Sequence, residues 1–331
     1  MQVAKAADVS TATVSRCLSN PEIVRPSVRA RVESAVEVLG YTPDAAARTL
    51  VTQRSATIGV IVPTLELASF ARGIQSLQRR LDESQYTPLL TISNFDKAEE
   101  LRHARNLVSR GVDGVMLVGL DHDPKLYTLL EKYNIPFVTT WGFDPKSAVP
   151  CVGFDNRGAM RRITDYVLSM GHRNVAMIVG GMWQINDRSR ERPAGFRDSL
   201  KHGKCEIPEE RIVEVPFSMD SAQAALRQLM IGENPPSAIV CGSDLLAIGA
   251  ILECRRMGIE VPADLSITGF DDLEIAAHFN PGLTTVDIPA EKMGVKAAEY
   301  LIDRINGISG PEQIELDYKL VLRESVISVR N

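Results

Sequence analysis

The chain has 331 residues, of which 44% are apolar and 24% charged, a composition typical of a globular protein with two domains or more. Its net charge of −5 is unevenly spread: residues 1–54 hold seven Lys and Arg against five Asp and Glu, or +2, which leaves −7 for the rest. A mildly basic N-terminal segment followed by an acidic remainder fits an N-terminal domain that binds phosphate groups, although a charge of +2 is also common in other domains.

The same totals argue against export and against a membrane protein. The first residues contain no apolar signal-peptide region, and no apolar run reaches the ~18 residues that a membrane helix needs. The five cysteines are odd in number and form no C-x-x-C pair, so we expect reduced, mostly buried thiols and a cytoplasmic protein.

Residues 3–40 predict three short helices. The second helix can be capped by Ser10 or Thr11, and Pro26 begins the third, which Gly40 ends. This spacing is typical of a helix-turn-helix. The predicted core of the three helices consists of Ala4, Val9, Val14, Leu18, Val32, Val36 and Leu39.

The exposed face of the second helix carries short side chains and one long donor. Thr11, Ala12, Thr13 and Ser15 would let the helix lie deep in a major groove, where Arg16 could reach a guanine edge. A solvated helix face would have the same composition, so this pattern alone leaves both interpretations open.

The stretch 42–50 predicts a helix of only two turns. Pro43 suits the first helical position and residues 45–47 are all alanine, but so short a helix is not stable alone in water. We therefore expect it to join the head to the body and to depend on both.

From Thr57 onward, short apolar runs alternate with amphipathic segments. Apolar runs without alternation indicate strands buried on both faces, and strands that alternate with helices indicate parallel sheets. About ten strands, in two similar runs that divide near Phe154, favour two doubly wound subdomains. Helices are expected near residues 66–84, 97–110, 125–133, 158–170, 192–201, 221–230, 245–257 and 292–305.

Polar and aromatic residues follow several predicted strands directly. Ligands bind past the carboxyl ends of parallel strands, where carboxylates can accept hydroxyl groups and a Trp can stack on a sugar ring. The alternative is that the Asp and Ser side chains cap the helices that follow. The candidates are Trp141, Asp155, Ser243, Asp244 and Asp271.

No enzyme motif accompanies these candidates. The sequence lacks G-x-G-x-x-G, Walker A, G-x-S-x-G and H-E-x-x-H patterns and any spaced Cys/His cluster. We therefore predict neither an enzyme nor a cofactor or metal site.

Two segments resemble the lactose/galactose repressor (LacI/GalR) family of bacterial transcription regulators: 3–16 is similar to its headpiece and 40–50 to its hinge helix. The chain departs from the family at Asp8, where a turn glycine is usual, and it lacks the usual Ile-x-Asp lead into the first helix. The resemblance implies base reading by Thr11, Ala12 and Arg16, phosphate contacts by Thr13, Ser15 and Arg25, and DNA contact by Arg48 and Leu50, with Leu50 wedged into the minor groove.

The rest of the chain resembles the family's type I periplasmic-binding-protein-like sensor. The implied domains are a headpiece at 1–42, a hinge and linker at 43–54, and an effector-binding and dimerisation domain at 55–331. Its N-subdomain would comprise 55–154 and 287–318, and its C-subdomain 155–286 and 319–331.

The resemblance also implies effector contacts. Arg192, before Pro193-Ala194-Gly195-Phe196, matches the family's effector-binding arginine, and Asp271 its ligand-binding aspartate. If Arg188 and Arg192 both point inward, they would favour an anionic effector; the alternative for this arginine-rich stretch is a solvated face. Further positions implied are Ser69, Phe70, Asn186, Arg188 and Phe217.

The predicted function is a cytoplasmic, homodimeric repressor of a carbohydrate or sugar-acid operon. It would bind a near-palindromic DNA operator under the control of a sugar, sugar acid or sugar phosphate, and some motifs, such as 253–258, are similar to gluconate-type repressors. The alternative is a sugar-binding protein of the same sensor fold without a DNA role. Induction and corepression, and dimer and tetramer, remain open.

Overall fold

The computed structural model describes residues 2–19, 21–41, 54–181 and 186–329. It forms two compact units, Met1–Ala56 and Thr57–Asn331. No helix within the described ranges is both long and apolar enough to cross a membrane. The predicted hinge, with Arg48 and Leu50, falls outside the described residues.

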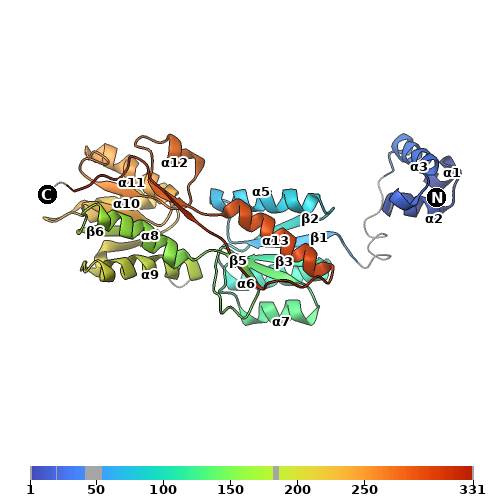
Figure 1. Ribbon diagram of the computed structural model, residues 1–331, viewed down its shortest axis with the longest axis horizontal. Coiled ribbons are helices and arrows are strands. Elements are labelled where there is room, and N and C mark those ends of the chain that lie inside the picture. The colour runs from blue at the N-terminus through green and yellow to red at the C-terminus, as the bar shows by residue number, and fades with distance from the viewer. Residues whose placement is uncertain (1, 20, 42–53, 182–185, 330–331) are drawn as a thin grey trace. The chain divides into compact units, whose positions relative to one another are not determined.

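The first unit is a helix-turn-helix, drawn in blue in Figure 1. Asp8 adopts a left-handed conformation with φ of 50°, so the turn forms with Asp in place of Gly. Ser10 caps the second helix by accepting a hydrogen bond from the Thr13 amide at 3.1 Å. Gly40, with φ of 55°, ends the third helix as expected. The helices are α1 (Gln2–Ala6), α2 (Thr11–Ser19), the 3-10 helix η1 (Pro21–Ile23) and α3 (Pro26–Leu39).

The predicted core of this unit was wrong at two positions. Leu18 is 38% exposed and Leu39 is 43% exposed within the unit. Leu18 lies at the edge of the α2 face that buries Val14 and Cys17, and the other helices of the unit cover it only in part. The core consists of Val3, Ala4, Ala7, Val14, Cys17, Val32 and Ala35, with Val9, Val24, Val28 and Val36 partly buried against it.

In the second unit, one parallel sheet forms the N-subdomain, with strand order β11-β5-β4-β3-β1-β2. Helices α6 and α7 cover one face, and α5 and α13 cover the other, where they lie side by side (Figure 1). The elements are β1 (Thr57–Val62), α5 (Ala68–Asp82), β2 (Thr87–Ile92), α6 (Lys97–Ser109), β3 (Gly114–Val118), α7 (Pro124–Lys132), β4 (Phe137–Thr140), β5 (Cys151–Gly153), α13 (Ala290–Ile305) and β11 (Gln313–Glu315).

A second parallel sheet, with strand order β7-β6-β8-β9, forms the C-subdomain. Helices α10 and α11 bury an apolar core against one face, and α8 and α9 pack together against the other. The elements are α8 (Asn156–Ser169), β6 (Val175–Gly180), α9 (Asp187–His202), the 3-10 helix η2 (Glu209–Arg211), β7 (Ile212–Val215), α10 (Met219–Met230), β8 (Ala238–Cys241), α11 (Asp244–Met257), β9 (Ser266–Thr268) and α12 (Glu274–His278).

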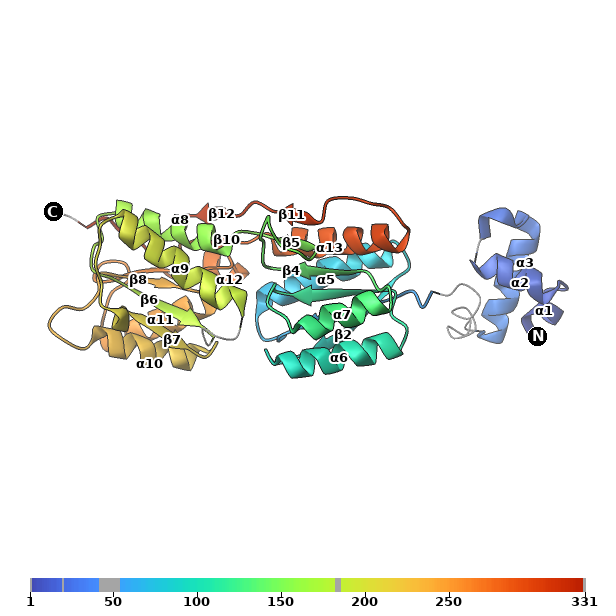
Figure 2. The same ribbon diagram turned by 90° about the horizontal axis from the view of Figure 1, so that it is seen from below.

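The chain passes between the two sheets three times. It leaves β5 for α8, leaves β10 (Thr285–Asp287) for α13, and returns through β12 (Lys319–Val321). Strands β10 and β12 pair antiparallel, and they run between the subdomains in Figure 2. This antiparallel ribbon therefore connects the two doubly wound halves.

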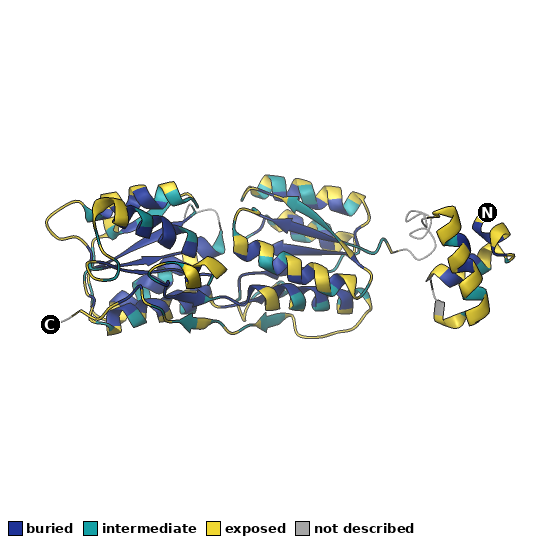
Figure 3. Ribbon diagram, turned by 90° about the horizontal axis from the view of Figure 1, so that it is seen from above, coloured by how far each residue is buried: buried dark blue, intermediate teal, exposed yellow. Residues whose placement is uncertain are grey.

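The central strands are buried on both faces, as their uninterrupted apolar runs predicted. Every residue of β3 and β6 is buried, and Figure 3 shows both sheets as dark blue layers beneath partly exposed helices. Two helices differ from prediction. The short helix α12 was not predicted, and α9 begins at Asp187 rather than near Arg192 because Asn186 caps it through the Ser189 amide.

Helices α5 and α13 approach closely through two glycines. A Cβ on Gly294 would lie 2.0 Å from the Gly73 carbonyl oxygen, and a Cβ on Gly73 would lie 2.4 Å from the Trp141 ring. Because the Trp141 ring packs against α5 at Gly73, the contact between α5 and α13 also fixes one wall of the cavity described below.

We expect Gly294→Ala to lower the melting temperature by about 5 °C, because overpacking against a backbone atom costs about 1–3 kcal/mol and outweighs the better helix propensity of Ala. Gly310→Ala is the control, since its new methyl group would meet only the tip of Arg304 at 3.8 Å. Equal melting temperatures for the two variants, measured by calorimetry, would contradict the close contact.

Candidate functional site

A small cavity lies where the carboxyl ends of both sheets meet. Its free volume is about 30 Å³, room for one water molecule. Residues from α5, from the β4 strand end, from the start of α9 and from the loop after β9 all reach it. The lining consists of Leu67, Ser69, Phe70, Phe95, Trp141, Val179, Gly180, Asn186, Arg188, Ser189, Arg192, Phe217, Gly242 and Asp271.

The early start of α9 brings its two key arginines together. Arg188 and Arg192 are one helical turn apart, so both side chains lie on the same helix face and both are buried. The expected alternative, a solvated arginine face, applies only to Arg190, which is exposed and pairs with Asp121 at 2.8 Å.

The guanidinium of Arg192 is buried and already has partners within the chain. Its Nε donates to Asn156 Oδ1 at 3.1 Å and its Nη1 donates to the Gly242 carbonyl at 2.7 Å, while the group stacks 4.0 Å from the centre of the Phe270 ring. Burial lowers the pKa of Arg192 to about 10, although the nearby Asp271 opposes the shift. Two of its nitrogens are thus engaged, and it offers no free bidentate fork to an anion.

Asp271 faces Arg192 across the cavity. Its Oδ1 lies 3.9 Å from Arg192 Nη2, and its backbone has a positive φ of 114°, a conformation that a non-glycine residue rarely adopts. Arg72, on α5 of the other subdomain, holds this strained loop by donating to the carbonyls of Asp271 at 2.7 Å and Asp272 at 3.2 Å. Burial raises the pKa of Asp271 to about 7, and Arg192 opposes the shift.

Aromatic rings form the remaining walls. Phe70 meets Trp141 edge to face with ring centres 5.1 Å apart, and Phe95 stacks on Phe217 at 6.4 Å. The buried Nε1 of Trp141 has no hydrogen-bond partner in the described part of the chain. Sequence reasoning missed Phe95, which is the third residue after β2, whereas Trp141 is the first residue after β4.

Three candidates lie away from this cavity, and two of them take the alternative role of helix capping. Asp155 caps α8 by accepting from the Gly158 amide at 2.8 Å, and Ser243 caps α11 by accepting from the Leu246 amide at 3.3 Å. Both side chains are therefore engaged in helix capping, and neither lines the cavity.

Asp244 is fully buried, which raises its pKa to about 6. Its oxygens accept from the Thr285 hydroxyl at 2.5 Å and the Leu273 amide at 2.6 Å. It therefore ties α11 to β10 and to the loop before α12, and it is an internal acceptor rather than a cavity residue.

The candidate DNA-reading residues lie on the surface of the headpiece. Thr11, Ala12, Ser15 and Arg16 on α2 are exposed, as is Arg25 before α3. Thr13 is half-buried, and its hydroxyl bonds to Ser10 Oγ at 2.9 Å, so it also supports the helix start. In the first two turns of α2, the exposed side chains are thus small except for Arg16, which suits a groove-reading helix.

Comparisons with known proteins agree with both units. Residues 1–44 match the lacI family of bacterial regulatory proteins, and residues 164–326 match the periplasmic binding protein-like domain. The chain is 32% identical over 328 residues to the HTH-type transcriptional repressor PurR of Klebsiella pneumoniae (strain 342), covering 98% of this chain and 95% of that one.

Two solved structures are each 30% identical to the chain. The transcription regulator GntR from Chromobacterium violaceum has a TM-score of 0.77 and covers 81% of this chain and 98% of its own. The transcriptional regulator CelR–cellobiose complex has a TM-score of 0.73 and covers 98% of both chains. A helix-turn-helix followed by a two-subdomain sensor defines a DNA-binding transcriptional repressor. The chain belongs to the lacI family of bacterial regulatory proteins.

The buried carboxyl of Asp271 predicts a pH dependence. Its pKa is about 7 in the folded chain against an ordinary 3.8, so the folded chain holds a proton that the unfolded chain releases. The stability from this group is complete below about pH 4 and is lost as the pH rises through 7. Between pH 5 and pH 8 we expect Asp271→Asn to gain on the order of 2 kcal/mol relative to the parent chain. Thermal unfolding at both pH values measures this, and a constant difference would contradict it.

Proposed function

We propose that the operator affinity of this repressor is controlled by a small, hydroxyl-rich effector that binds between the two sensor subdomains. The observation that carries the proposal is the buried Arg192–Asp271 pair at the junction of both sheets. A buried cation and a carboxyl group, each with hydrogen-bonding capacity facing one cavity, are expensive to maintain unless a ligand uses them.

The chemistry of the lining favours a sugar. Asp271 can accept hydroxyl protons, Asn186 and Ser189 can donate or accept, and the faces of Phe70 and Trp141 can pack on the C–H groups of a ring. The CelR relative binds cellobiose, which agrees with a carbohydrate ligand. We therefore propose a sugar or sugar derivative as effector and a carbohydrate catabolic operon as target.

The small size of the cavity supports a coupling to DNA. Pockets for small ligands usually measure about 300–1,000 Å³, far more than the 30 Å³ found here. An effector in this cavity must therefore displace side chains or widen the cleft, and widening changes the angle between the subdomains. By linkage, a ligand that prefers the wider cleft changes operator affinity if the two sensor states differ in DNA affinity.

The proposed assembly is a homodimer on a near-palindromic operator. Two α2 helices would enter successive major grooves, and the 43–54 segments would join the headpieces to the sensors and approach the minor groove. The alternative function, a sugar-binding protein without a DNA role, is disfavoured because the headpiece retains its exposed reading face.

A DNA-shift assay on the region upstream of the protein's own gene tests this function. It should be run against a panel of neutral sugars, sugar acids and sugar phosphates. We expect retarded DNA whose amount changes with one class of sugar. Binding to that DNA that no member of a broad sugar panel affects would contradict the effector class, and a sugar-binding protein that shifts no DNA would favour the alternative.

Replacing Leu50 with Ala should weaken operator binding by about tenfold or more, because it removes the apolar group proposed to wedge into the minor groove. Effector affinity, measured by calorimetry without DNA, should stay unchanged. Unchanged operator affinity would show that 43–50 is not the hinge.

Replacing Arg192 with Ala should abolish the effector response while operator binding persists. The substitution removes one of the cavity's two buried cations, and Arg192 lies in the second unit and not in the headpiece. Lys201→Ala is the matched control, since Lys201 is an exposed cation near the other end of the same helix. A soluble, folded Arg192 variant that no longer bound DNA would contradict this division of roles.

A further inference from the structure

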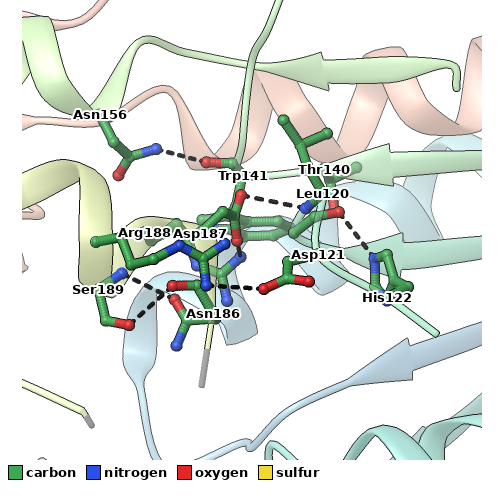
Figure 4. A network of polar contacts seen from close by, with 12 residues as sticks. Leu120, Asp121, His122, Thr140, Trp141, Asn156, Asn186, Asp187, Arg188 and Ser189 are labelled. Atoms are coloured by element: carbon green, nitrogen blue, oxygen red, sulfur yellow. Dashed lines mark hydrogen bonds and ion pairs between the residues drawn. The ribbon is translucent and has the colours of Figure 1, made fainter. Parts of the chain in front are cut away.

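The Asp187–Arg188 pair forms a partition within the cleft. Arg188 borders the site cavity on one side and a larger cavity of about 540 Å³ on the other, and Asp187 borders the larger one. Figure 4 shows both side chains, from the first turn of α9, near the 120–122 loop of the N-subdomain, to which Asp187 is joined through the Leu120 amide. The pair therefore lies where the two subdomains and the two cavities meet.

The carboxylate of Asp187 accepts one hydrogen bond from each subdomain. Its Oδ1 lies 3.0 Å from Arg188 Nη1, and its Oδ2 accepts from the Leu120 amide at 3.1 Å. Both charged side chains are largely buried, with 9% of Arg188 and 13% of Asp187 exposed. A guanidinium and a backbone N–H that converge at a helix N-terminus are the usual components of an anion site.

Two glycines make room for this carboxylate. A Cβ on Gly119 would lie 2.8 Å from Asp187 Oδ1, and a Cβ on Gly142 would lie 2.5 Å from Asp187 Oδ2. Gly119 is the first residue after β3 and Gly142 is the second residue after β4, so the ends of two neighbouring strands are shaped around the Asp187 side chain.

We propose that Arg188 and the Leu120 amide form an anion site that the chain's own Asp187 occupies, which makes Asp187 the residue that discriminates against anionic ligands. The role as a determinant of effector specificity rests on the proposed function. A ligand carboxylate or phosphate that approaches Arg188 must displace Asp187 or lie beside its like charge. A hydroxyl group meets no such barrier, because it can donate to the Asp187 carboxylate.

Other carboxylates around the larger cavity also disfavour an anionic ligand. The larger cavity is also lined by Asp144, Asp155, Glu191 and Glu315, so an anion there meets further negative charge. Arg192 offers little compensation, because Asn156 and Gly242 already use two of its nitrogens. An anionic ligand therefore depends on Arg188, and Asp187 controls access to it.

Inorganic phosphate is the direct probe, because it needs no knowledge of the effector. Calorimetric titration of the full chain at constant ionic strength should show that Asp187→Ala binds phosphate about tenfold more tightly than the parent chain. The variant frees both the charge and the space beside Arg188. Should it fail to fold, Asp187→Asn keeps an acceptor for Leu120 and should give a smaller gain of about threefold.

Two controls make the outcome specific. Glu315→Ala removes a carboxylate from the same cavity without freeing Arg188, so phosphate affinity should change less than twofold. Adding Arg188→Ala to Asp187→Ala should abolish the gain. Equal phosphate affinity in the parent chain and a folded Asp187 variant, or an equal gain in Glu315→Ala, would overturn the proposal.

A matched sugar pair separates this proposal from the proposed function. In the DNA-shift assay, Asp187→Ala should raise the response to gluconate relative to glucose, whichever the parent chain prefers. A phosphate gain with no sugar response in any chain would refute the effector class but leave the anion site. A sugar response without a phosphate gain would refute the anion site alone.

Discussion

A largely buried positive charge lies at the junction of the two subdomains, and much of the surrounding structure depends on it. The guanidinium of Arg192 is held by an amide oxygen, a backbone carbonyl, an aromatic face and the carboxyl of Asp271. Leaving such an ion unpaired would cost several kcal/mol. The elements that supply these partners, α8, the β8 strand end and the loop after β9, are therefore constrained to converge where α9 begins.

The same region concentrates unusual backbone conformations. Trp141, Asp271 and Asp272 all have positive φ, although none is glycine, and each lies within four residues of the end of a strand in one of the two sheets. Such conformations cost about 1–3 kcal/mol each and persist only where the surroundings enforce them. Here the enforcement includes Arg72, which reaches from α5 to the carbonyls of Asp271 and Asp272 and so ties one subdomain to the strained loop of the other.

Contacts of charged side chains join the two subdomains across the cleft, so a ligand in the cleft would affect how closely the subdomains approach. Asp187 bonds to the Leu120 amide and Arg190 pairs with Asp121, so the first turn of α9 is attached to the loop after β3. A ligand that entered this space would compete with these bonds as well as with the aromatic contacts. These contacts between the subdomains cannot all persist when the cleft widens, and this is the physical basis of the proposed control of DNA affinity.

The sequence by itself determined the architecture, because it depends on local patterns. Unbroken apolar runs such as 58–62 specify strands buried on both faces, Pro26 and Gly40 delimit a helix, and Asp8 could be expected to tolerate the left-handed turn that it adopts. The strand-end rule also selected Trp141 and Asp271 in advance, and both line the cavity.

Only the tertiary structure decided which strand-end side chains face the cavity and which are used within the fold. Asp155, Ser243 and Asp271 all follow strands. The side chains of Asp155 and Ser243 nevertheless cap the helices that come next and do not face the cavity. The pairing of Asp187 with Arg188 was equally beyond sequence reasoning. It depends on the Leu120 amide and on space left by Gly119 and Gly142, residues that are far away in the chain and are brought together only when the two sheets meet.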